Sequence, residues 1–102
     1  MQDKRLALHE KLCEILDSRN AYFNPPEDFR MKYPAIRYKL SGIPTTFANN
    51  NPYLQNQDYN LILIDYDPDS PLVKKILNLP YCKFDRHYTA NNLNHWSFTI
   101  SI

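Results

Sequence analysis

The sequence contains a single glycine, Gly42, in 102 residues, and this scarcity excludes several kinds of functional site. Phosphate-binding P-loops, dinucleotide-binding fingerprints and the nucleophile elbow of α/β-hydrolases all need glycines at fixed spacing. Because glycine is missing from almost every turn, asparagine is expected to take most positions with a positive φ angle. Asparagines do occur in runs, at Asn49 to Asn51, Asn56, Asn91, Asn92 and Asn94.

Cysteine, net charge and long apolar runs are also scarce. Cys13 and Cys82 form no CxxC pair, so we expect two reduced thiols and, from them, a reducing compartment. The 12 basic and 11 acidic residues give no uniform field toward nucleic acid or an anionic membrane. No apolar stretch reaches the roughly 18 residues of a membrane span, and the N-terminus lacks a signal-peptide core, so no membrane association is expected. The length favours one domain over residues 1–102.

The first third of the chain is predicted to form a helix and then a strand. Apolar residues at helical spacing indicate an amphipathic helix over residues 3–19 that covers a sheet. They are Leu8, Leu12, Ile15 and Leu16. Pro25 and Pro26 cannot continue a helix, so the segment 22–26 is expected to end it. Residues 33–40 then alternate between apolar and polar side chains, which predicts a half-buried strand.

Residues 41–57 are the least regular part of the sequence. Two prolines and three consecutive asparagines interrupt it, so we expect a long connection or an extended hairpin with short strands. A connection of this length needs a function or a partner to justify it. The candidates for a contact surface in this segment are Phe47, Asn50, Tyr53 and Leu54.

Residues 59–66 are predicted to form a central strand, because the run Leu61 to Ile64 leaves little polar surface on either face. A second helix is expected to follow, with Ser70 or Asp69 as its N-cap and Pro71 in its first turn. Its apolar residues are Leu72, Val73, Ile76, Leu77 and Leu79, and Pro80 ends it.

Residues 82–89 and 93–102 are predicted to close the chain as a hairpin around Asn91 and Asn92, which suit a type I′ turn. The hairpin is either a second contact surface, through these two asparagines, or part of the core with a turn. The predicted elements do not follow a strict β-α repeat. We therefore expect an α+β fold, a small mixed or antiparallel sheet with two helices packed on one face.

Three groups of side chains imitate chemical sites. Asp65, Asp67 and Asp69 match the start of a calcium-binding EF-hand loop, but the position that needs a glycine is Ser70 and the position that needs a bidentate glutamate is Ile76. Acidic residues before a helix are favourable without any metal. We therefore expect no metal site here.

The histidines give no stronger signal for chemistry. With a two-residue turn His95 faces Tyr88 and His87 faces Trp96, which places the two imidazoles diagonally and short of a third zinc ligand. His9 and Cys13 are four residues apart on one helical ridge, but no orienting group or oxyanion hole accompanies them, so a packed helix face is the favoured interpretation. We expect no catalytic residue, no metal and no cofactor, and hence no enzyme.

Aromatic residues make up 14% of the chain, with eight tyrosines. Stacking platforms for single-stranded nucleic acid need basic residues on the same face as the aromatic ones. Only the group Tyr33, Arg37, Tyr38 and Lys39 comes close, and Tyr38 alternates away from the two charges. Protein interfaces use tyrosine equally well, and we favour that interpretation.

Several stretches resemble small virion proteins of tailed bacteriophages, from the head-completion and tail-completion group. They are Tyr22 to Glu27, Met31 to Ile36, Asn51 to Tyr53, Ile64 to Pro71 and, above all, the run from Phe84 to His95. The resemblance covers about residues 22–102, and the order of elements is similar to the tail-terminator fold.

This resemblance implies a structural role without a covalent step. A tail terminator forms a ring, typically hexameric, that caps the tail tube and joins the tail to the neck, so the implied partners are other copies, the tail tube protein and the neck or head-tail connector protein. The implied location is the tail or neck of the virion, assembled in the bacterial cytoplasm. A head-closure or connector protein is the first alternative, and a small nucleic-acid-binding or regulatory module is the second. Candidates for lining a channel through which genomic DNA passes are Arg30, Lys32, Arg37 and Lys39.

Overall fold

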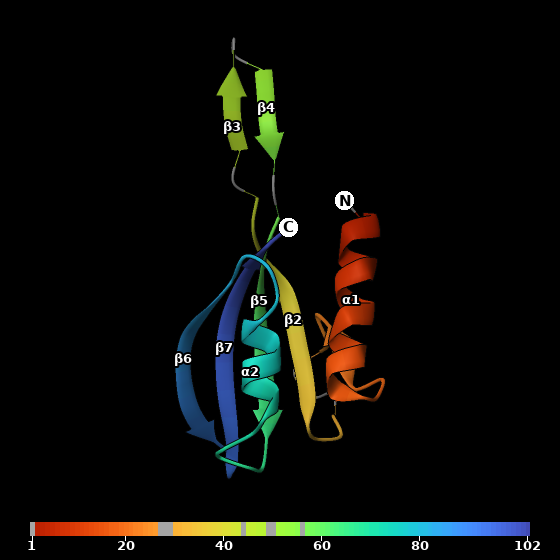
Figure 1. The fold of residues 1–102 in the computed structure, drawn as a ribbon, viewed down its shortest axis with the longest axis vertical. Coiled ribbons are helices and arrows are strands. Elements are labelled where there is room, and N and C mark those ends of the chain that lie inside the picture. The colour runs from red at the N-terminus through yellow and green to blue at the C-terminus, as the bar shows by residue number, and fades with distance from the viewer. Residues whose placement is uncertain (1, 27–29, 44, 49–50, 56) are drawn as a thin grey trace.

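The computed structural model describes residues 2–26, 30–43, 45–48, 51–55 and 57–102, with side chains at all of these except 2–3, 45–48 and 51–55. The chain forms a five-stranded mixed sheet with two helices on one face, so the predicted α+β class is confirmed (Figure 1). The helices are α1 (Gln2–Leu16) and α2 (Leu72–Leu77). The strands of this sheet are β1 (Ala21–Phe23), β2 (Ala35–Gly42), β5 (Asp58–Asp65), β6 (Cys82–Ala90) and β7 (Leu93–Ser101).

The strands lie in the order β1-β2-β5-β7-β6, with β1 parallel to β2 and every other pair antiparallel. The apolar run predicted as a central strand is β5, and Leu61 and Leu63 in it are completely buried. One hydrophobic core fills the space between the sheet and both helices. Its larger members are Leu8, Leu12, Leu16, Ile36, Tyr38, Tyr59, Leu61, Leu63, Ile76, Trp96, Phe98 and Ile100.

Helix α1 ends at Leu16, three residues before the predicted end at residue 19. Asp17 adopts a left-handed conformation with φ of 55°. The Ser18 N–H donates to the Cys13 carbonyl and the Asp17 N–H donates to the Glu14 carbonyl, both at 3.2 Å. These two bonds form a Schellman motif, which satisfies the last carbonyls of the helix and stops it.

The prediction that residues 22–26 end the helix was therefore wrong, and the short strand β1 was missed. Three residues carry too little periodicity to be recognised, and β1 exists because β2 lies beside it. The pairing joins Ala21 with Ile36 and Phe23 with Tyr38. Ala21 is buried in the core, so β1 covers the outer edge of β2 next to α1.

Helix α2 has six residues and begins at Leu72, with Pro71 rather than Ser70 or Asp69 at the N-cap position. The Ser70 hydroxyl nevertheless accepts a hydrogen bond from the Leu72 N–H at 3.3 Å, so it acts on the first turn from one position further away. The helix ends at Leu77, before Pro80 is reached.

The closing hairpin is confirmed. Strands β6 and β7 are joined by Asn91 and Asn92, whose φ angles of 54° and 63° are both positive, as a type I′ turn requires. The predicted register, with His95 opposite Tyr88 and His87 opposite Trp96, is also observed.

The described part of residues 43–57 contains two short strands that pair as the expected extended hairpin, and this hairpin projects from the body. Strands β3 (Thr45–Ala48) and β4 (Asn51–Gln55) pair with each other as a separate two-stranded sheet, which we call the arm. Figure 1 shows the arm continuing beyond the end of β2 and the start of β5, away from both helices. The molecule is accordingly elongated, with principal extents of 51 × 24 × 22 Å.

Candidate functional site

The predicted contact residues fall on two opposite ends of the molecule. Three lie on the arm strands, namely Phe47, Tyr53 and Leu54. Asn50 lies outside the described residues. Asn91 and Asn92 form the β6–β7 turn, and β7 runs from this turn to Ser101, which pairs with Asp58 at the base of the arm. A single copy therefore cannot present both sets on one surface.

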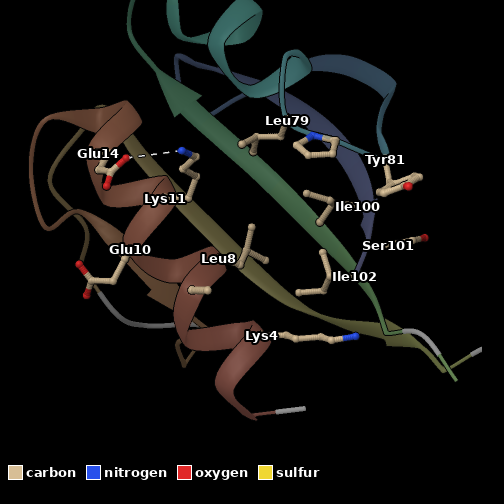
Figure 2. Close-up of a pocket in the computed structure, with 12 residues that line it drawn as sticks. Lys4, Leu8, Glu10, Lys11, Glu14, Leu79, Tyr81, Ile100, Ser101 and Ile102 are labelled. Carbon is tan, nitrogen blue, oxygen red and sulfur yellow. Dashed lines mark ion pairs between the residues drawn. The ribbon is translucent and has the colours of Figure 1, made fainter.

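An apolar groove of about 1000 Å³ lies on the helix side of the sheet, at the end that carries the arm (Figure 2). It exists because the six-residue α2 covers only part of the sheet beside α1. Its apolar lining comes from α1, from the loop after α2 and from the end of the chain. These residues are Ala7, Leu8, Leu79, Pro80, Tyr81, Ile100 and Ile102. Tyr81, which is 84% exposed, adds an aromatic ring to this lining.

The charged residues along the groove balance one another. Lys4, Glu10, Lys11 and Glu14 contribute two positive and two negative charges from α1. The Lys11 ammonium also lies 3.8 Å from the Glu14 carboxylate. The groove thus offers apolar surface with no net charge, and an uncharged apolar occupant fits it best. Sequence patterns did not indicate this groove, because three separate segments build it.

The other face of the sheet carries basic residues in an ordered arrangement. The cross-strand register places Arg37, Ile62, Ser97 and Arg86 in one row across β2, β5, β7 and β6. The next row is Lys39, Asn60, Thr99 and Lys83. Each row thus begins and ends with a cation. From strand spacings, the two ends lie about 14 Å apart and the two rows about 7 Å apart.

Acidic groups on this face are engaged by neighbouring hydroxyls. The Thr99 hydroxyl donates to the Asp85 carboxylate at 2.7 Å, and the Ser101 hydroxyl donates to the Asp58 carboxylate. The Asn60 amide donates to the Ser97 hydroxyl at 2.9 Å. Among the described residues, the four corner cations outnumber these two carboxylates, so this part of the face is basic in a chain whose formal charge is only +1.

Two of the four predicted channel residues belong to this basic face. Arg37 and Lys39 line the same small hollow with Asn60 and Ile62. Arg30 and Lys32 are exposed on the connection between β1 and β2, outside that hollow. Lys83 and Arg86 were missed, because only strand pairing reveals that β6 shares a face with β2.

Two features of the outer edge of β6 disfavour pairing with another strand, a bulge and charged side chains. Its register shifts between Phe84 and Arg86, which makes Asp85 the extra residue of a bulge. Charged side chains flank this bulge, and bulges and charges are the usual protection of exposed edges. The Arg86 guanidinium also lies 4.9 Å from the centroid of Tyr88, which stacks on His95 at 4.9 Å.

The histidines of the two predicted motifs take part in ring packing and hydrogen bonds. His87 packs against Trp96, with ring centroids 5.2 Å apart, while His95, the neighbour of Trp96 in β7, faces the other side. The predicted diagonal approach of the imidazoles was therefore wrong. His9 Nδ1 lies 2.6 Å from the Tyr38 hydroxyl, and Cys13 is buried in the core. Burial and then the Arg19 charge lower the pKa of His9, so the neutral imidazole is favoured.

The acidic run before α2 organises the backbone. Asp65 accepts a hydrogen bond from the Asp67 N–H at 3.3 Å, and Asp67 accepts one from the Asp69 N–H at 2.9 Å. These are Asx turns, which use the carboxylates locally. Among the described residues, no three His, Cys, Asp or Glu side chains come together as a metal site would require.

No described helix has the length and apolar character needed to cross a bilayer.

The candidate functional surfaces are the arm, the neutral apolar groove and the basic sheet face. Comparison with protein-family models, with curated proteins and with solved structures finds no match for the chain.

Proposed function

We propose that this protein is a structural component of a tailed-bacteriophage virion, a tail terminator whose copies form a ring on the end of the tail tube and join the tail to the neck. The observation that carries this proposal is the arm. Two short strands extend beyond the five-stranded sheet and, among the described strands, pair only with each other. A two-stranded ribbon is marginally stable by itself in water, so a projecting ribbon gains stability when a partner covers it.

The sequence of the arm supports a contact with protein. No Asp, Glu, Lys or Arg occurs between Lys39 and Asp58, although 23% of the chain is charged. Exposed two-stranded ribbons that stay in solvent usually carry charges that prevent association. An uncharged arm with Phe47, Tyr53 and Leu54 is instead suited to burial in an assembly.

The basic sheet face fits the same proposal. In a ring it is the surface suited to the channel, where genomic DNA passes without sequence-specific contact. The corner cations Arg37, Lys39, Lys83 and Arg86 supply attraction to phosphates.

The mass of the purified protein in solution tests the ring. Wild-type protein is expected to form a closed oligomer of several copies, visible as rings in negative-stain images. A variant in which an Asn-Gly turn replaces residues 45–56 should stay folded and become monomeric. A monomeric wild type, or rings that persist without the arm, would contradict this proposal.

A nucleic-acid-binding module remains the second candidate, and the basic sheet face is the observation that favours it. In that case a monomer should bind DNA, and the logarithm of affinity should fall linearly with the logarithm of salt concentration. Lys83→Gln should reduce that slope by about one, the effect of one lost phosphate contact. Lys75→Gln is the matched control, because Lys75 is exposed on α2, on the helix side of the sheet.

A further inference from the structure

We propose that the apolar groove between α1 and β7 is the docking site for the arm of a second copy of this chain. This inference rests on the proposed self-assembly and names the two surfaces that make the contact. It assigns a partner to each of the two features that a single copy leaves incomplete, the uncovered groove and the uncovered ribbon.

Charge is the first reason for this pairing. The arm carries no charged residue, and the four charges of the groove cancel as two lysines against two glutamates. Lys11 pairs with Glu14 and Glu10 pairs with Arg19, and the exposed Lys4 can keep its ammonium in water on its long side chain, so docking need not bury an unpaired charge. The open sheet face, which is basic, and the β6 edge, which carries Asp85 and Arg86 beside its bulge, fit the arm less well.

Size is the second reason. A two-stranded ribbon with its side chains is about 10 Å wide and 10 Å thick, and it advances about 3.3 Å per residue pair. A groove of about 1000 Å³ then holds about three residue pairs. The arm has four registered pairs, from Thr45 with Gln55 to Ala48 with Asn51. The groove can therefore receive most of the arm.

Position is the third reason. The groove and the base of the arm lie at the same end of the molecule, because Gln57 and Ile102 exchange backbone hydrogen bonds of 2.8 and 2.9 Å. The arm points away from its own groove, so a neighbour's arm is the one available to enter it (Figures 1 and 2). Contacts between two different surfaces of this kind can close into a ring or pair reciprocally around a two-fold axis.

A complementation experiment tests the contact directly. Ala7→Arg places a charged side chain in the groove from an exposed helix position and leaves the arm intact. The armless variant, with an Asn-Gly turn in place of residues 45–56, leaves the groove intact. Each variant should be monomeric alone, and a mixture should form one-to-one heterodimers, because one partner supplies the arm and the other the groove. Leu6→Arg is the matched control, since Leu6 is 47% exposed on α1 and does not line the groove.

We expect Ala7→Arg to weaken self-association by about 30-fold or more, as for a residue at the centre of an interface, and Leu6→Arg to assemble as the wild type does. Near-ultraviolet circular dichroism checks that both variants are folded. A photo-crosslinking residue at position 47 should label residues 79–81 or 100–102 of another copy. Crosslinks to the groove of the same copy, or to another surface, would overturn the inference.

The outcomes separate this inference from the proposed function. A wild-type ring that tolerates Ala7→Arg would keep the ring and refute arm docking in the groove. Complementation that yields a reciprocal dimer in place of a ring would keep the docking and refute the tail-terminator ring. A wild-type chain that never associates would refute both.

Discussion

Replacement of Tyr38 by phenylalanine should cost about 1 kcal/mol of folding free energy, the usual net value of one intramolecular hydrogen bond. Tyr38 is 2% exposed, and its hydroxyl lies 2.6 Å from His9 Nδ1, so this part-buried bond links α1 to β2. The ring stays in place in the variant, because Phe23 and Tyr59 hold it with centroids 5.1 and 6.1 Å away. The variant loses the bond to His9 and the contact of the hydroxyl with Arg5, and the partly exposed His9 can turn to water.

The assay is urea unfolding followed by the fluorescence of Trp96, the only tryptophan of the chain and a core residue. For a domain of this size, the same loss should lower the melting temperature by about 4–8 °C. Protein concentration must be equal for all variants, because association changes apparent stability. Tyr81→Phe is the control, since its side chain is 84% exposed and its change should stay within about 0.5 kcal/mol. Equal losses for the two variants would refute a bond that stabilises the fold.

Three further predictions concern single residues. Burial and the charges of Arg19 and Arg5 outweigh Glu10 and lower the pKa of His9. The stability that neutral His9 contributes should therefore be complete above the ordinary pKa of 6.5 and be lost as the pH falls below it. Urea unfolding at a series of pH values should show a weaker pH dependence of stability in His9→Gln. Asn92→Val should destabilise the protein by about 1–2 kcal/mol, because Asn92 has φ of 63°, whereas Asn92→Gly should fold as stably as the wild type in the same unfolding assay. Burial and then Asp85 raise the pKa of Cys82 to about 11 from 9.0. In a Cys13→Ala background, the Cys82 thiol should therefore react with a disulfide reagent at pH 8 roughly 100-fold more slowly in the folded protein than after unfolding in urea. Equal rates would contradict this prediction.

The sequence predicted those elements whose signals are local and strong. The apolar run of β5 placed it at the centre of the sheet, and Asn91 with Asn92 fixed both the turn and the register of the last hairpin. Helix ends were less predictable. The stop of α1 depends on Asp17 in a left-handed conformation, a role for which glycine or asparagine is the usual signal.

Features that depend on tertiary neighbours could not be predicted. β1 has three residues and is a strand only because β2 pairs with it. The basic sheet face joins Arg37 on β2 to Arg86 on β6, and no spacing along the chain indicates that the two share a face. The groove depends on the shortness of α2, which α2's own apolar pattern did not reveal.

The groove and the basic sheet face lie on opposite sides of the sheet, so the two proposed activities should be separable by mutation. Ala7→Arg acts on the helix side and Lys83→Gln on the open side, and the two positions share no contacting residue in the groove or the rows. The free-energy effects of substitutions at two sites without shared contacts usually add. The double variant should therefore combine the assembly defect of one with the weakened DNA attraction of the other, measured by mass and by salt-dependent DNA binding to the monomer. If Ala7→Arg alone abolished DNA attraction by the monomer, the basic face would not be the surface that DNA contacts.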